Sequence, residues 1–291
     1  MDEMEGHRYW ATPQGWLVMA ARSSPATFHW DPFTGARISL PPDREGFLGG
    51  GGGGLKRCLL SCKPAVADPS CSLVLVVDLD QTVLWYCRPL GAGGDDGDRW
   101  RRHEYEFAAA GAETLGSVLW SMERLASVGG SFFMSLIDKV ARLDFLPEPQ
   151  FTVIPEDLST ASWPPWAPWA VSSTSQLVES RGSLFCVRFI LSDLRMRFVA
   201  GIGVFRLDLS AQAWVRVGSL GGRAFLVHHE FGASLDPQEE AAGLKGDCIY
   251  YCMPNDKALY VYDRERGTTA FANPGSCLAD RCSAKVLMPT C

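Results

Sequence analysis

Aspartates near the ends of apolar stretches are the first residues whose types and spacing could do chemistry. Asp78 and Asp80, one residue apart, follow the run Leu73–Val77, and such a pair could act as general acid and general base. Together with Asp208 and Asp263, they would suit a hydrolase or a sugar-processing enzyme if they converged in one channel. The alternative is that each aspartate ends a strand and starts a turn. We favour turns, because Asp208 and Asp263 hold equivalent places in repeated segments.

Cysteine and histidine could instead hold a metal ion. The chain has two equally spaced cysteine pairs and one histidine pair: Cys58 and Cys62, Cys248 and Cys252, and His228 and His229. Zinc sites usually combine short spacings that close a tetrahedron. Even spacing also places Cys248 and Cys252 on one face of a strand, where both could be thiols packed in the core instead of metal ligands. We favour structural thiols and expect no metal and no other cofactor.

The common catalytic motifs are missing from the sequence. It contains neither a Gly-x-Ser-x-Gly elbow nor a His-Glu-x-x-His helix. The glycine run at 49–54 continues as Leu55-Lys56-Arg57 and lacks the Gly-Lys-Ser/Thr ending of a phosphate loop. Arg206 stands where a dinucleotide motif starting at Gly201 would need its third glycine. We therefore expect a protein that is not an enzyme.

A proline-rich segment, Ser162–Trp169, carries tryptophan at every third position. In a polyproline II helix three residues make one turn, so Trp163, Trp166 and Trp169 would lie along one edge. Because tryptophan is enriched at interface hot spots, these three residues are a candidate anchor for a protein partner. The alternative is a loop whose indoles fold back over the protein.

Short strands must position these residues, because one loose pattern of apolar strands and turns recurs along the chain. The repeated segments start at Gly15, Cys71, Ser131, Gly182 and Gly246. They begin about 50 to 65 residues apart, near the spacing of kelch-like propeller blades. Pairs such as Thr34-Gly35 and Arg266-Gly267 supply the turn chemistry. A helical stripe fits Thr114–Ala126, but we favour a strand there.

The repeat predicts an all-β fold, a kelch-like β-propeller of roughly five or six blades. One blade cannot bury both of its faces alone, whereas several blades around an axis can. The expected organisation is a short tail over residues 1–14, a propeller over 15–272 and a C-terminal tail over 273–291. This organisation leaves open whether the first blade is complete.

The net charge and the lack of recognisable targeting signals limit the classes of partner and the compartment that we expect. The 27 basic and 33 acidic residues give a net charge of -6, which disfavours a nucleic-acid binder. The longest apolar run, Leu73–Val77, is far shorter than the roughly 20 residues of a membrane span. Because Met1–Gly6 is acidic and no apolar stretch follows it, we expect no secretory leader and therefore expect the ten cysteines to be reduced. We expect an intracellular protein of the cytoplasm, the nucleus or both, with no nucleic-acid or membrane partner.

Several short motifs follow one another in the C-terminal half of the chain. They are Leu207-Asp208, Trp214 with Val217, Ser219-Leu220-Gly221 with Arg223-Ala224, and Cys248-Ile249-Tyr250. In this order they resemble the C-terminal signature of the plant KIB-type β-propeller family, also called domain of unknown function 295. Residues 177–187 and 31–42 match as well, so the likeness extends from about Gly15 to about Thr268.

The resemblance implies a propeller that receives a protein. In this family an F-box usually precedes the propeller and binds the Skp adaptor of a cullin ubiquitin ligase, while the propeller is taken to receive the substrate. Few residues precede Gly15, so we expect no F-box and no Skp binding. The glycine run after Phe47 is a second departure from the family pattern. The expected function is a non-enzymatic protein-binding module with an unidentified partner; an enzyme and a degenerate, non-functional copy are the alternatives.

Overall fold

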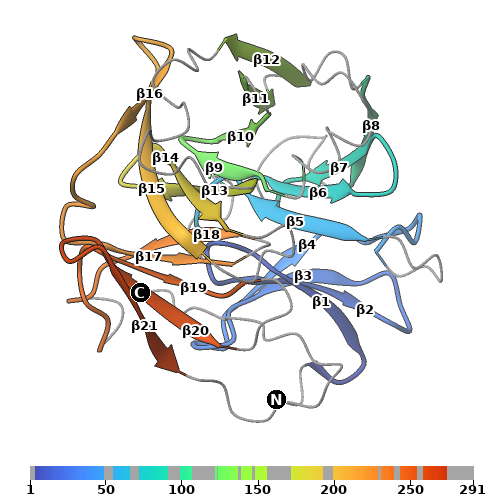
Figure 1. The fold of residues 1–291 in the computed structure, drawn as a ribbon. Helices are drawn as coiled ribbons and strands as arrows, with labels where there is room; N and C mark the ends of the chain where they lie inside the picture. Colours follow the sequence, from blue (N-terminus) through green and yellow to red (C-terminus); the bar gives the residue numbers. More distant parts are fainter. Residues whose placement is uncertain are drawn as a thin grey trace. The chain divides into compact units, whose positions relative to one another are not determined.

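The regular structure of this chain is almost entirely β-strand. The computed structural model describes residues 4–48, 55–65, 72–90, 99–106, 122, 124–136, 139–145, 148–155, 172–192, 199–228, 231–238, 243–253 and 258–273. Within these ranges the strands form five sheets (Figure 1). The expected all-β class is therefore confirmed, and the number of sheets lies within the expected range of blades.

The chain divides into two compact units, the first of which comprises Met1–Leu136 and Ala141–Val153 among the described residues. Its first sheet contains β1 (His7–Ala11), β2 (Leu17–Ala21), β3 (Thr27–Trp30) and β4 (Arg37–Leu40). Its second sheet contains β5 (Lys56–Leu60), β6 (Val74–Asp78), β7 (Val83–Cys87) and β8 (Arg101–Glu104). The third sheet contains β9 (Ala126–Val128), β10 (Ser131–Ser135), β11 (Lys139–Phe145) and β12 (Pro149–Pro155).

The second unit, which includes Ile154–Val286, holds the other two sheets. The fourth sheet contains β13 (Ser172–Ser180), β14 (Ser183–Leu191), β15 (Val199–Asp208) and β16 (Ala213–Arg216). The fifth has the order β18-β17-β19-β20-β21, with β17 (Ala224–Val227), β18 (Gly232–Leu235), β19 (Cys248–Tyr251), β20 (Leu259–Asp263) and β21 (Thr268–Asn273). Strands β17 and β19 pair in parallel, whereas β17 with β18 and β19 with β20 pair antiparallel.

The expected segments begin one strand too late in the first four sheets and two strands too late in the fifth. The segment expected from Gly15 covers β2 to β4, but the tail expected at 1–14 contains β1. β1 pairs with β2 from His7 opposite Ala21 to Ala11 opposite Leu17, so the first sheet has four strands. Because β1 is half-buried and carries histidine and arginine, it lacks the apolar signal of β2. The N-terminal boundary is therefore corrected to include β1.

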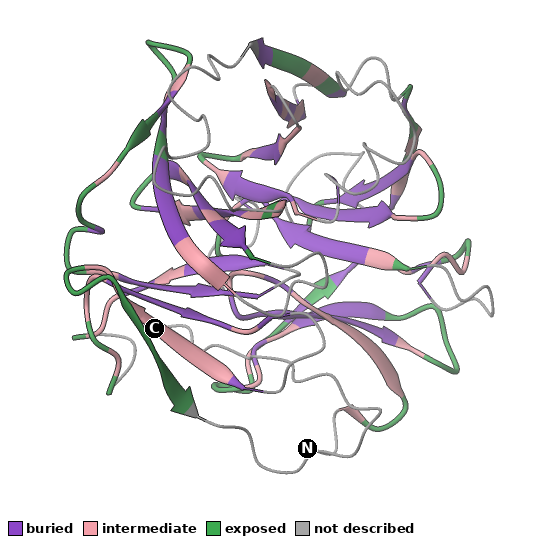
Figure 2. Ribbon diagram, viewed as in Figure 1, coloured by how far each residue is buried: buried purple, intermediate pink, exposed green. Residues whose placement is uncertain are grey.

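Alternation along the strands builds separate apolar cores on the two faces of the second sheet. Cys58 and Leu60 of β5 join a core with Val18 and Ile38 of the first sheet. Leu59, between them in the sequence, joins the core shared with the third sheet. β6 and β7 are buried along their whole length (Figure 2). These two strands therefore carry the centre of the first unit.

Hydrogen bonds and one close backbone approach hold neighbouring sheets together within each unit. In the first unit the Gln14 side chain donates to Leu60 O at 3.1 Å and to Ser127 Oγ at 2.8 Å, which links the first three sheets. In the second unit β18 lies against β13 at Gly232. A Cβ at Gly232 would lie 2.6 Å from Leu177 O, so only glycine permits this approach.

Candidate functional site

The acidic residues considered for catalysis are engaged in turns and ion pairs. Asp78 forms an ion pair with Lys56 at 2.6 Å and accepts a hydrogen bond from Asp80 N at 3.0 Å. Asp80 accepts a hydrogen bond from Leu55 N at 2.9 Å. This pair therefore fastens the β6–β7 turn to the start of β5.

Asp208 and Asp263 occupy equivalent places, as the repeat predicts. Asp208 ends β15 and accepts hydrogen bonds from the backbone of Ser210 and Ala211. Asp263 ends β20 and accepts from Arg266 N at 3.1 Å and from the Lys245 ammonium at 2.6 Å. The hydroxyl and amide of Ser210 lower the pKa of Asp208, and the Lys245 hydrogen bond lowers the pKa of Asp263. Each carboxylate thus stabilises a hairpin turn as an anion.

The described cysteines are packed or half-buried thiols. Cys58 and Cys248 are buried in β5 and β19, and Cys62 and Cys252 are half-buried just beyond those strands. Burial raises the pKa of Cys248, and burial also raises that of Cys58 far above its usual range. Among the described residues, no three histidine, cysteine, aspartate or glutamate side chains are grouped as metal ligands would be. His228 is buried, and His229 lies outside the described residues.

The candidate anchor residues Trp163, Trp166 and Trp169 lie outside the described residues. Their role in partner binding stays a prediction.

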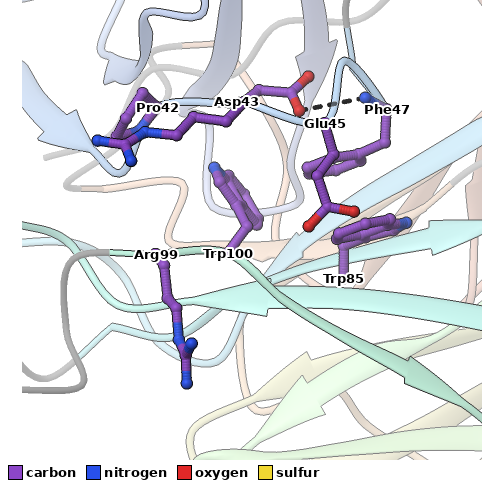
Figure 3. A pocket seen from close by; sticks show the side chains of 8 residues that line it. Pro42, Asp43, Glu45, Phe47, Trp85, Arg99 and Trp100 are labelled. Atoms are coloured by element: carbon purple, nitrogen blue, oxygen red, sulfur yellow. Dashed lines mark hydrogen bonds between the residues drawn. The ribbon is translucent and has the colours of Figure 1, made fainter.

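An open pocket of about 590 Å³ in the first unit is the site that the sequence did not predict (Figure 3). We call this site the aromatic pocket. It is lined by Pro42, Asp43, Arg44, Glu45, Phe47, Trp85, Arg99 and Trp100. They come from the segment after β4, from β7 and from the residues directly before β8. Its volume falls within the usual range for ligand pockets, about 300 to 1,000 Å³.

Three aromatic rings form the apolar wall of this pocket. Phe47 stacks on Trp85 with 4.1 Å between ring centroids and 4° between planes. Trp100 meets Phe47 edge to face at 5.1 Å, and its indole N–H donates to Pro41 O at 2.8 Å. These contacts fix the orientation of the rings without help from a ligand.

A buried carboxylate holds the segment that carries Phe47. Asp43 accepts hydrogen bonds from Phe47 N at 3.1 Å and from Leu48 N at 2.7 Å. It thereby orders the backbone around the pocket, while Leu48 is inserted in the core between the first two sheets. Asp43 is therefore a positioning residue rather than a contact for a ligand.

Exposed charged side chains complete the pocket. The Glu45 carboxylate points toward Trp85, and Arg99 and Trp100 extend to opposite sides of the backbone (Figure 3). Arg44, Glu45 and Arg99 are exposed, whereas Trp85 and Trp100 are buried to more than nine-tenths. An apolar floor with charged groups of both signs at its rim is typical of a protein contact site.

The family of the chain follows from its match to a family model. The model of the KIB1-4 beta-propeller matches residues 1–272. The chain belongs to this family. Membership identifies the five sheets as propeller blades, and it confirms the resemblance inferred from the motifs.

Solved structures are similar to this KIB-family chain only at a distance. Kluyveromyces lactis Hsv2 is 12% identical, with a TM-score of 0.37, over 90% of this chain and 60% of that one. The Cps50 (Swd1) propeller domain of Myceliophteria thermophila is 11% identical, with a TM-score of 0.33, over 90% and 70%. The chain thus spans about 60% of the length of Hsv2. A search among curated proteins found no match. No helix within the described ranges has the length and apolar character of a membrane span.

The residues that carry the KIB signature in the second unit have a structural role. Asp247 accepts hydrogen bonds from Ser219 Oγ at 2.7 Å, Leu220 N at 2.5 Å and Gly222 N at 3.0 Å. Burial alone would raise the pKa of Asp247, but these hydrogen bonds outweigh it and lower the pKa below its usual value. Arg223 donates to Ser234 O at 2.8 Å. The signature thus ties the turn before β17 to the start of β19.

Proposed function

We propose that this chain is a non-enzymatic propeller that binds a protein, and that the aromatic pocket receives side chains of the partner. The observation that carries the proposal is the combination of Phe47, Trp85 and Trp100 with exposed charges at the rim. Aromatic and arginine side chains supply most of the binding free energy at protein interfaces. The turn roles of Asp78, Asp208 and their counterparts also support a binding function over catalysis.

The wider proposal follows the family resemblance. It is that the chain is related to the substrate-recognition part of plant F-box proteins, acts in the cytoplasm or nucleus, and uses Trp163, Trp166 and Trp169 as a second anchor. Binding of the Skp adaptor is not part of it. No observed feature favours a second function strongly enough to propose it.

Affinity purification of the tagged chain from plant cells, with mass spectrometry, tests the proposal. The pocket variant is Arg44→Ala with Glu45→Ala, because both side chains are exposed and their loss leaves the aromatic core in place. The matched control is Glu265→Ala with Arg266→Ala, an exposed pair of the same residue types in the second unit. A triple variant of the three tryptophans is purified in parallel.

A partner that the pocket variant loses and the control retains supports the aromatic pocket as its site. Loss in the tryptophan variant alone moves the site to the proline-rich segment. Equal recovery by all variants contradicts both sites. Recovery of the Skp adaptor would contradict our expectation about ligase assembly.

A further inference from the structure

One histidine in the first unit is enclosed by apolar residues. His29 lies on β3, opposite Val18 of β2 and Ile38 of β4, and its side chain is fully buried. The Trp16 ring meets it edge to face, with 6.3 Å between ring centroids. Directly opposed residues point to the same side of a sheet, and Val18 and Ile38 both belong to the core shared with the second sheet. His29 therefore faces that core.

Neither ring nitrogen of His29 has a hydrogen-bond partner in the described part of the chain. The indole nitrogen of Trp16 beside it is likewise buried without one. A buried polar group without a partner costs about 1 to 3 kcal/mol, so a charged imidazolium there would be far more costly. The site accepts histidine only in its neutral form.

The titratable groups in the described part of the surrounding core offer no counter-ion. Within the core between the first two sheets they are the thiols of Cys58 on β5 and Cys87 on β7. Burial raises the pKa of both thiols well above the usual value, so they are neutral.

The charged side chains around this core are already engaged. Lys56, on the same face of β5 as Cys58, pairs with Asp78, and Arg102 beside Trp85 pairs with Glu104. The nearby carboxylates of Asp31 and Asp43 accept backbone hydrogen bonds. Among the described residues, neither imidazole nitrogen of His29 has a carboxylate as a hydrogen-bond partner.

The sign of the pH effect follows from burial. Burial lowers the pKa of His29 to about 3, whereas an unfolded histidine titrates near 6.5. The stabilisation is complete above pH 6.5 and is lost as the pH falls toward 3, since the open state then binds the extra proton. Each pH unit in this window favours opening by about tenfold.

The same core supports the aromatic pocket. Trp85 and Trp100 belong to it, and Phe47 packs against it. Separation of the first two sheets would therefore remove the aromatic wall of the pocket together with the core that supports it.

We propose that His29 is an acid-sensitive switch, whose protonation separates the first sheet from the second and dismantles the aromatic pocket. The switch goes beyond the proposed function, and it is measured here without any partner. If the switch were refuted, the proposed partner binding would still stand, and if partner binding were refuted, the switch would still stand.

Hydrogen–deuterium exchange of the full chain between pH 7.5 and 4.5, corrected for intrinsic exchange, tests the switch. Peptides over β2 to β4 should show an opening constant that rises roughly 100-fold across this range. Peptides over β19 and β20, in the second unit, serve as the internal reference and should change much less.

Two substitutions separate His29 from general acid effects. His29→Leu replaces the ring by an apolar side chain of similar size and should abolish most of the 100-fold rise. His103→Leu, on β8, removes a half-buried histidine of the same unit and should leave the rise intact. An equal rise in His29→Leu and the wild type overturns the proposal.

A measurement on the wild type covers the case in which His29→Leu fails to fold. The imidazole shifts of His29, followed by NMR, should show a neutral ring down to at least pH 5. A ring that titrates near 6.5 in the folded protein would overturn the proposal without any variant.

Discussion

Alanine in place of Gly246 should destabilise the second unit, because its methyl group would meet the backbone of Gly222. A Cβ at this position would overlap the carbonyl oxygen of Gly222 and lie 3.1 Å from its carbonyl carbon. Both atoms are backbone, so neither can turn away as a side chain would. Relief requires the start of β19 to move from the turn before β17.

That movement breaks known hydrogen bonds, which sets the magnitude. Forcing a methyl group into a packed site costs about 1 to 3 kcal/mol. The shift also weakens the hydrogen bonds from Leu220 N and Gly222 N to Asp247, each worth about 1 kcal/mol. We expect a loss of about 3 kcal/mol. With a slope of about 2 kcal/mol/M, the urea midpoint should fall by about 1.5 M.

Urea unfolding of the full chain, followed by hydrogen exchange of β17 and β19 peptides, measures this loss in the second unit. The matched control is Gly218→Ala, in the connection between β16 and β17 that also contains Gly222. Nothing lies within 4 Å of a Cβ there, so its midpoint should stay close to that of the wild type. If Gly246→Ala unfolded at the same urea concentration as Gly218→Ala, the close approach of Gly246 and Gly222 would be refuted.

Substitutions at three further contacts test their contribution to stability. Asp43→Ala should lower the unfolding free energy of the first unit by about 1 to 3 kcal/mol, because two backbone amides lose their acceptor; exchange at Phe47 and Leu48 reports it. Lys56→Met should lower the unfolding free energy by about 1 to 3 kcal/mol, since it leaves the Asp78 carboxylate without its cation. The double variant Lys56→Met with Asp78→Leu should recover much of that loss, as measured by thermal melts. The lowered pKa of Asp247 contributes stability that is present above about pH 4 and lost as the pH falls through the folded pKa. Asp247→Asn should therefore flatten acid unfolding of the second unit below pH 4, and an unchanged acid limb would contradict this.

Local chemistry explains which parts of the fold the sequence predicted. The turn role of Asp208 and Asp263 was correct, because a short carboxylate bonds the amides two or three residues ahead wherever the hairpin lies. The repeated segments were also correct in number. The first strand of each of the first four sheets was missed, as were β17 and β18 of the fifth: β5 follows a glycine run, and β13 begins with the polar sequence SSTSQ.

The aromatic pocket and the buried histidine depend on contacts between distant segments. Phe47, Trp85 and Trp100 meet only after the first two sheets pack, so no spacing in the sequence marks them as neighbours. His29 sits in the sequence ThrPheHisTrp, and its burial follows from its neighbours on β2 and β4.

The parallel pairing of β17 with β19 also bears on how the last sheet assembles. β17 and β18 form one antiparallel hairpin, while β19 to β21 form a meander of neighbours in sequence. Each piece closes through short loops, but Phe225 reaches Ile249 only by a longer crossover. Loop closure costs more for such a contact, so the two pieces should form first and join in a later, slower step. The hydrogen bonds of Asp247 connect the β17–β18 hairpin to the β19–β21 meander, so they form in the later step. They should therefore affect the rate of unfolding more than the rate of folding.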